Sequence, residues 1–265
     1  MRHYELGVAP SIPHGHWWRA TPDALVRLNF IIGAPVLYRP ESGREFALPP
    51  VNVITLHTRP YGVCYTGEVR VIGVQLQPWA LFAITGRSYI STPNSVFNAA
   101  EVLGLDLARL LPALATCDHT QAAQLVNGSL NKLFKSAGSA SQERIAQATS
   151  AINKVRGIIR ASTLSDSFHL TSRRLQQLFA QRMGVSAKVY ARLVRFHEGM
   201  VRMHEPDYDP MRVVAECGFY DQPHLIREFK AFTSATPSAF RPQGSWRLFT
   251  KAADLHGSDV VTFSL

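Results

Sequence analysis

Hydrophobic and polar positions follow two different periods along this chain of 265 residues. Up to about residue 77, short runs of β-branched and aromatic residues are separated by turns rich in Pro, Gly, Asn and Ser, a pattern typical of strands. The predicted strands are 25–32, 36–38, 51–57 and 68–76. We interpret this half as a mostly antiparallel β-sandwich or barrel. Beyond Pro78 the pattern becomes helical and predicts helices at 79–84, 106–114 and 119–134.

From about residue 140 to residue 233 the pattern is helical, and residues that favour helix ends mark most boundaries. Thr171 and Ser186 are good N-caps for predicted helices at 172–183 and 187–204, and Gly184 ends the first of these. A proline in the first turn predicts two more helices, at 210–217 behind Asp209 and at 222–233 behind Asp221 or Gln222. Earlier helices are predicted from Ser139 or Ser141 to about 157, and behind Thr163 through 168.

The small polar residues SAGSAS at 136–141 are typical of a flexible connection between the two halves. We therefore predict an α+β chain with a β-rich domain and trailing helices at 1–135, a linker at 136–141 and an all-α domain at 142–245. Residues 246–265 form a C-terminal extension of unknown role. Within it, 260–263 is either an added strand or part of a loose end.

Within the helical half, a short helix, a tight turn and a helix of about twelve residues occur twice, at 164–183 and 210–233. This is the helix-turn-helix arrangement, whose second helix lies in the major groove of DNA. Arg and Gln on the outward side of that helix suit guanine and adenine edges. The candidate DNA-binding residues are Arg173, Arg174 and Gln177 on the first such helix and Gln222, His224, Arg227 and Lys230 on the second.

Composition narrows the class of protein. Hydrophobic residues make up 46% and charged residues 18%, which is typical of a globular chain and excludes a disordered one. No window of eighteen apolar residues occurs and the N-terminus lacks the apolar core of a secretory signal, so we predict no membrane span and a cytoplasmic location. Cys64, Cys117 and Cys217 are too scattered for a disulfide framework or a structural zinc site.

The charge distribution points to an anionic partner of the second half. The formal net charge is +9, and residues 140–265 carry 17 Lys and Arg against 11 Asp and Glu. A basic balance is compatible with nucleic acid, anionic lipid or acidic ligands.

Residues 164–241 resemble the tandem helix-turn-helix domain of the AraC/XylS transcription regulators. The most specific pieces are VAECGFYDQ at 214–222, HLIREFK at 224–230 and TPSAFR at 236–241. The first motif is present as Leu175, Leu178, Phe179, GVS at 184–186, Tyr190 and Arg195. Two positions depart from the family, which commonly has Ala where this chain has Ser165 and Gly where it has Ser234. Because all of these are small residues, we expect the helix packing to survive.

The resemblance implies a sequence-specific DNA-binding regulator whose partners are double-stranded promoter DNA and, for an activator, RNA polymerase. Helices 172–183 and 222–233 would enter successive major grooves, roughly 34 Å apart, with the helix at 187–204 setting the span. Phosphate contacts are expected from Arg195, Arg202, Lys230 and Arg241.

The N-terminal half resembles, more weakly, the effector domains attached to a subset of these regulators. The match is the strand-to-helix passage GVQLQP at 73–78, followed by Ala80, Phe82 and Gly86. It implies a cupin-like domain at 1–135 that binds a small-molecule effector or pairs two copies into a homodimer. His14 and His16 have the spacing of a cupin metal site, but no acidic residue follows within a few positions, so we predict no metal and no cofactor.

Enzyme functions find no support, because no GxSxG, P-loop, dinucleotide-binding or HExxH pattern occurs. A DNA-repair alkyl acceptor would also carry this type of helical domain, but its cysteine cluster is missing. A non-DNA adaptor that retains the helical fold stays open as an alternative. It is distinguished from a DNA reader by whether Arg173, Arg174, His224 and Arg227 lie on one basic face.

Overall fold

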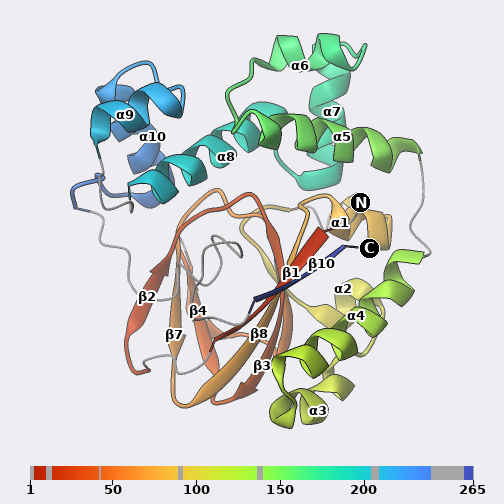
Figure 1. Cartoon of the computed structure of the whole chain (residues 1–265). Coiled ribbons are helices and arrows are strands. Elements are labelled where there is room, and N and C mark those ends of the chain that lie inside the picture. Colours follow the sequence, from red (N-terminus) through yellow and green to blue (C-terminus); the bar gives the residue numbers. More distant parts are fainter. Residues whose placement is uncertain are drawn as a thin grey trace.

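The computed structural model describes residues 3–9, 14–41, 43–88, 92–135, 140–203, 209–239 and 260–264. In Figure 1 a β domain lies on one side and a group of helices, coloured green to blue, lies across one end of it. This is the α+β architecture that the sequence predicts. The predicted linker lies largely outside the described residues, and so does the tail before residue 260.

The β domain consists of two antiparallel sheets. One has six strands in the order β10-β1-β8-β3-β6-β9, and the other has four in the order β2-β7-β4-β5. Their bounds are β1 His3–Ala9, β2 Trp17–Ala20, β3 Val26–Gly33, β4 Val36–Pro40, β5 Phe46–Ala47, β6 Val51–Ile54, β7 Tyr61–Tyr65, β8 Val69–Leu76, β9 Val96–Asn98 and β10 Val260–Ser264. The four predicted strands correspond to β3, β4, β6 and β8. Residues 260–263, predicted as either an added strand or part of a loose end, belong to a strand, since β10 pairs with β1 (Figure 1).

Strand β3 is nearly continuously buried because both of its faces are covered. Leu28 and Phe30 belong to a core shared with the helices that follow the sheet, whereas Ile31 belongs to a core between the two sheets. The polar residues Arg27 and Asn29 lie on the same side as Ile31, because side chains alternate along a strand. The register thus brings a charged and an amide side chain into the space between the sheets.

The helices of the first half cover the outer face of the six-stranded sheet (Figure 1). They are α1 Ala80–Thr85, α2 Ala99–Leu103, α3 Leu111–Thr116 and α4 His119–Lys135. The single helix predicted at 106–114 is wrong: a short 3-10 turn at Ala108–Leu110 precedes α3, which begins one residue before Pro112. Proline fits only the first turn of a helix, since it lacks the N–H that an interior position donates.

The second half forms six helices within the described residues. They are α5 Ala140–Lys154, α6 Ala161–Ser167, α7 Ser172–Met183, α8 Ala187–Arg202, α9 Pro210–Glu216 and α10 Gln222–Thr233. The predicted bounds of α7 and α10 are confirmed. Helix α6 begins earlier than predicted, with Arg160 rather than Thr163 in the N-cap position. None of the helices in the described ranges is both long and apolar enough to cross a membrane.

The two halves share part of a hydrophobic core. Leu56, Trp79 and Ala83 of the β domain belong to the same cluster as Phe179 and Met183 of α7. Two further contacts join the halves. The guanidinium of Arg182 lies 3.6 Å from the ring centre of Phe82, and the Ser234 hydroxyl donates to Glu41 at 2.8 Å. The β domain therefore contacts the C-terminal ends of both α7 and α10.

Candidate functional site

Helices α7 and α10 are equivalent elements fifty residues apart in the sequence. Each has twelve residues, and each buries the same three positions, Leu175, Phe179 and Met183 in α7 and Leu225, Phe229 and Thr233 in α10. Each ends at a residue with left-handed backbone, Gly184 and Ser234. Ser234 thus adopts the conformation that glycine adopts at the first helix, which explains why the family prefers glycine there.

Side-chain caps determine where these helices begin. The Thr171 hydroxyl accepts from the N–H of Arg174, and the Asp221 carboxylate accepts from the N–H of His224 at 2.6 Å. The structure thereby decides between Asp221 and Gln222 in favour of Asp221. A carboxylate committed to the helix start is poorly suited to contact DNA, because it also repels phosphate.

On α7 the three candidate residues Arg173, Arg174 and Gln177 are all exposed. Gln181 is exposed as well, and it continues the row of Arg173 and Gln177 at intervals of four residues. The sequence analysis did not select Gln181, although the same spacing argument would have found it. The outward side of α7 therefore carries a row of donors long enough to follow several base pairs.

On α10 the candidates Gln222, Arg227 and Lys230 are exposed, and His224 is partly buried. The side chain of Arg227 is 68% exposed, with Nη2 3.9 Å from Oδ1 of Asp221. The Nδ1 atom of His224 accepts from the N–H of Tyr220 at 3.1 Å, and its ring packs edge-on against Phe219. His224 thus stabilises the turn before α10, and its neutral ring carries the remaining proton on Nε2.

Tyr220 in this same turn is 90% exposed, the most exposed of the large hydrophobic residues among those described. It directly precedes the cap of α10 and was not among the predicted site residues. Its aromatic ring stands in water beside the start of a candidate recognition helix. A hydroxyl-bearing aromatic in this position is suited to contact a sugar or phosphate.

Helix α8 holds the two candidate helices apart. Tyr190 in its first half packs against Phe179 of α7, and Phe196 in its second half packs against Phe229 and Phe232 of α10. The structure therefore places the seven predicted site residues in two groups, one on each helix. Figure 1 shows α8 running between the α6–α7 pair and the α9–α10 pair.

Arg195 of α8 joins the turn before α6 to the turn between α9 and α10. Its Nη2 donates to the carbonyl of Gly157 at 3.0 Å, and its Nη1 donates to the carbonyl of Gly218 at 3.4 Å. Burial lowers its pKa below the ordinary value, but an arginine stays charged at physiological pH. These contacts give Arg195 a structural role in place of the expected phosphate contact.

Arg202 is likewise engaged within the fold, with ion pairs to Glu198 at 3.0 Å and to Glu216. It therefore connects α8 to α9 and has little freedom to reach DNA. Arg241, the fourth residue expected to hold phosphate, lies outside the described residues, as does part of the TPSAFR motif.

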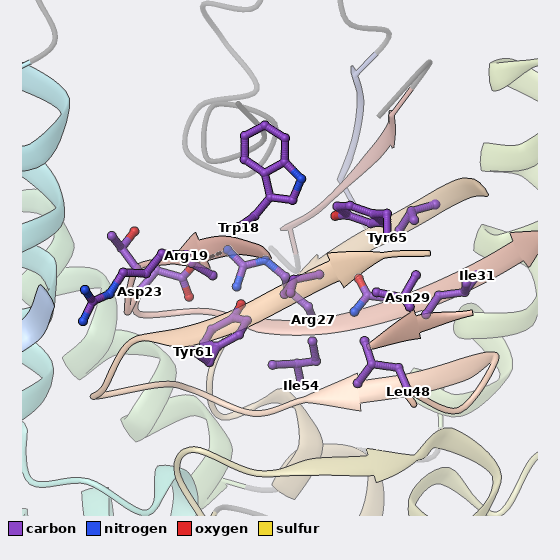
Figure 2. Close-up of a pocket in the computed structure, with 15 residues that line it drawn as sticks. Trp18, Arg19, Asp23, Arg27, Asn29, Ile31, Leu48, Ile54, Tyr61 and Tyr65 are labelled. Atoms are coloured by element: carbon purple, nitrogen blue, oxygen red, sulfur yellow. Dashed lines mark hydrogen bonds and ion pairs between the residues drawn. The ribbon is translucent and has the colours of Figure 1, made fainter. Parts of the chain in front are cut away.

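A second candidate site is a cavity of about 80 Å³ between the two sheets of the β domain. Figure 2 shows Arg27 and Asn29 of β3 pointing into it, with Tyr61, Tyr65 and Trp18 around them. Arg27 forms a buried ion pair with Asp23. Burial alone would lower the pKa of Arg27, but the Asp23 carboxylate and neighbouring tyrosines raise it above the ordinary value. The cavity is therefore lined by a charged pair, an amide and aromatic rings.

Within the described ranges, the side chains form no arrangement suited to metal binding or to a reactive thiol. No group of three or more His, Cys, Asp or Glu side chains that could hold a metal ion gathers there. His14 and His16 are both exposed, and the ring of His16 packs against Trp18. The three cysteines are free thiols, and burial raises the pKa of Cys217 to about 11, which disfavours a reactive thiolate.

Comparison with known proteins identifies the helical half. The family described as Helix-turn-helix domain matches residues 164–243. No curated protein matches the chain by sequence.

Comparison with solved structures gives matches at low identity. A variant of apo ToxT from Vibrio cholerae is 10% identical, with a TM-score of 0.53 over 93% of this chain and 97% of that one. Wild-type ToxT from Vibrio cholerae with bound unsaturated fatty acid is 10% identical, with a TM-score of 0.49 over 95% and 96% of the two chains. The AraC-like activator CuxR is 17% identical, with a TM-score of 0.29 over 64% and 66%.

The likeness to apo ToxT shows a shared fold, in which an antiparallel β domain precedes a helical domain. The family match covers both helix-turn-helix units and the helix α8 between them. Residues 164–243 form an AraC-type helix-turn-helix domain.

Proposed function

We propose that this protein reads promoter DNA by inserting α7 and α10 into successive major grooves on one side of the duplex. The observation that carries this proposal is the equivalence of the two helices, which bury the same positions and expose Arg and Gln on the opposite side. Arg173, Arg174 and Gln177 contact one groove, and Gln222, His224, Arg227 and Lys230 contact the next. The location of such a protein is the cytoplasm, where the chromosome lies.

The division of labour follows the two halves of the chain. Residues 1–135 form an effector-binding or dimerisation domain, 136–141 the linker, and 142–245 the DNA-binding domain. Two observations support this division: the family match begins at residue 164, and the cavity lies wholly in the β domain. The strand β10 adds to the β domain, which suggests a structural role for the end of the extension 246–265.

The effector of this proposal is a small molecule bound in the cavity between the sheets. The Arg27–Asp23 pair and Asn29 offer donors and acceptors to its polar groups, and Ile31, Ile54 and Val71 contact its apolar part. A ligand found by thermal-shift screening should raise the melting temperature of the wild type and not that of Asn29→Leu. Equal shifts in both proteins would place the ligand elsewhere.

The experiment that tests the main proposal is fluorescence anisotropy with the full-length protein. It compares the upstream promoter duplex with a scrambled duplex at two salt concentrations. Tighter binding to the promoter at the higher salt supports sequence reading, because phosphate attraction alone collapses with salt. Equal binding that collapses with salt would favour the adaptor alternative. Sedimentation of the same samples measures whether the protein is a homodimer. If the protein is an activator, RNA polymerase is a further partner.

A further inference from the structure

A groove of about 510 Å³ lies between the two helix-turn-helix units and contains none of the residues predicted to read bases except His224. One wall is the start of α6 with Arg160, the floor is α8 with Lys188, Arg192 and Arg195, and the other wall is α10 with His224 and Glu228. These residues come from three segments of the chain. The groove is therefore formed by tertiary packing, to which the hydrogen bonds of Arg195 to the turns at Gly157 and Gly218 contribute.

Two of the basic groups in this groove are already neutralised or occupied. Arg192 forms a bidentate ion pair with Glu228, with N–O distances of 2.8 and 2.9 Å. Arg195 donates to the two turn carbonyls. The single carboxylate of the groove is thus satisfied by one arginine.

The other cations of the groove face water. Arg160 and Lys188 are exposed, and within the part of the chain that the structure describes neither forms an ion pair with a carboxylate. His224 adds a polar N–H, because its Nδ1 accepts from Tyr220 and its neutral ring then carries the proton on Nε2. The groove consequently presents two uncompensated positive charges and one neutral donor to a ligand.

We propose that this groove binds a phosphate of the DNA backbone, in the stretch of duplex that passes between the two major grooves occupied by α7 and α10. The inference rests on the proposed function, since α7 and α10 flank α8 and successive major grooves are separated by an intervening stretch of backbone. Arg160 and Lys188 supply the charge for this contact. Such a contact carries no sequence information, but it sets the register of the protein on the duplex.

The test is the salt dependence of DNA binding by the full-length double variant Arg160→Gln/Lys188→Gln. Its slope of log affinity against log salt should be shallower than that of the wild type by about 1 for each removed contact. The loss of affinity should be the same on promoter and on scrambled duplex. The matched control is Arg144→Gln/Lys154→Gln, which removes two exposed charges from α5, a helix that contributes nothing to the groove. An unchanged slope in the first variant, or an equal change in the control, would overturn the proposal.

A second arm identifies the source of the phosphate. Promoter duplex with neutral methylphosphonate linkages at the central backbone positions should weaken binding of the wild type and leave the double variant unaffected. An equal loss in both proteins contradicts the assignment. Calorimetric titration with inorganic phosphate tests the other source. If phosphate binds the wild type and not the double variant, while the salt slope of DNA binding is the same in both proteins, the groove is a site for a free anion and the proposal is overturned.

The same data separate this inference from the proposed function. If the wild type does not discriminate promoter from scrambled duplex, sequence reading fails, while the slope difference still reports on the groove. If discrimination is intact and the slope is unchanged, the groove proposal alone fails. Because both replaced side chains are exposed, the circular dichroism and melting temperature of the variant should match those of the wild type.

Discussion

His57 is held neutral in the core of the β domain by burial, and its two hydrogen bonds fix its tautomer. Its Nδ1 lies 2.7 Å from the carbonyl of Thr55 and therefore donates, so its Nε2 accepts from the hydroxyl of Tyr38 at 2.7 Å. Burial lowers the pKa of His57 to about 4, and it raises the pKa of Tyr38. A charged imidazole carries a proton on both nitrogens, so the Tyr38 hydroxyl would have to turn from donor to acceptor, and the buried charge would lack a counter-ion at hydrogen-bond distance from its two ring nitrogens.

This predicts that acid weakens the fold through His57. In the unfolded chain the group protonates near its ordinary pKa of 6.5, whereas in the fold it stays neutral down to about 4. The unfolded state thus binds more protons in that window, and stability falls as the pH falls through it. Between pH 7 and pH 5 the contribution is about 2 kcal/mol. Urea unfolding of wild type and His57→Asn should show the free-energy gap between them shrinking by about this amount at pH 5. A gap independent of pH would contradict the assignment.

Arg227 is the exposed arginine best placed on α10 to read a base. If it contacts guanine, Arg227→Ala should cost about 1–3 kcal/mol on the promoter site and barely change binding to scrambled duplex. Anisotropy titrations of both duplexes measure this. Arg212→Ala, on the exposed side of α9, is the control. Equal losses on both duplexes would make Arg227 a phosphate contact instead.

At the scale of elements, the spacing of α7 and α10 depends on a close approach of two backbones. Gly157 has φ of +75°, and a Cβ there would overlap the carbonyl oxygen of Ala191. The turn can therefore lie directly on α8 only with glycine, and it is this turn whose carbonyl Arg195 binds. Gly218 lies in the other turn that Arg195 binds, and it packs against Ile158 from the turn that holds Gly157.

Gly157→Ala should accordingly destabilise the protein by about 3 kcal/mol or more, since it combines backbone strain with a clash. The matched control is Gly104→Ala, at a similar φ of +64° with nothing within 4 Å of the added carbon. It should cost only the conformational penalty, about 1–2 kcal/mol. Denaturant unfolding of both variants measures the difference. Equal costs would show that the approach of the turn to α8 is not tight.

At the scale of the whole molecule, the β domain packs against the C-terminal ends of both candidate recognition helices. Leu56, Trp79 and Ala83 complete the core beside α7, and Glu41 accepts from Ser234 at the end of α10. Arg59 also donates to this carboxylate, at 3.1 Å. The hydrogen bond from Ser234 and, to a smaller extent, the one from Arg59 lower the pKa of Glu41. The serine that departs from the family pattern thus contacts the β domain.

A fragment of residues 141–245 tests how far the helical half acts alone. It should bind promoter DNA, with affinity reduced by the loss of dimer avidity. It should also unfold at a lower temperature than the full chain, because it lacks the side chains that cover Phe179 and Met183. Anisotropy and thermal unfolding measure the two effects. A folded fragment with no measurable DNA binding would contradict the proposed division of labour.

Local chemistry by itself determined the helical half closely. The bounds of α7 and α10 follow from caps and stop residues a few positions away, such as Thr171, Gly184 and Asp221, and these act within one turn of helix. Strands β3 and β8 were also predictable, because both of their faces are largely buried and most of their residues are apolar. Short strands such as β2 and β9 were missed, since they pair with partners distant in the sequence and carry little pattern of their own.

Only the tertiary structure decided what the polar residues do. Arg195 and Arg202 look in the sequence like any basic residue of a DNA-binding domain, yet the fold commits both to internal partners. Arg160, Lys188 and His224 lie far apart along the chain, and only the packing of α6 and α10 on α8 brings them to one groove. A charge acts through the groups around it in space, and those groups are set by long-range packing that no local pattern records.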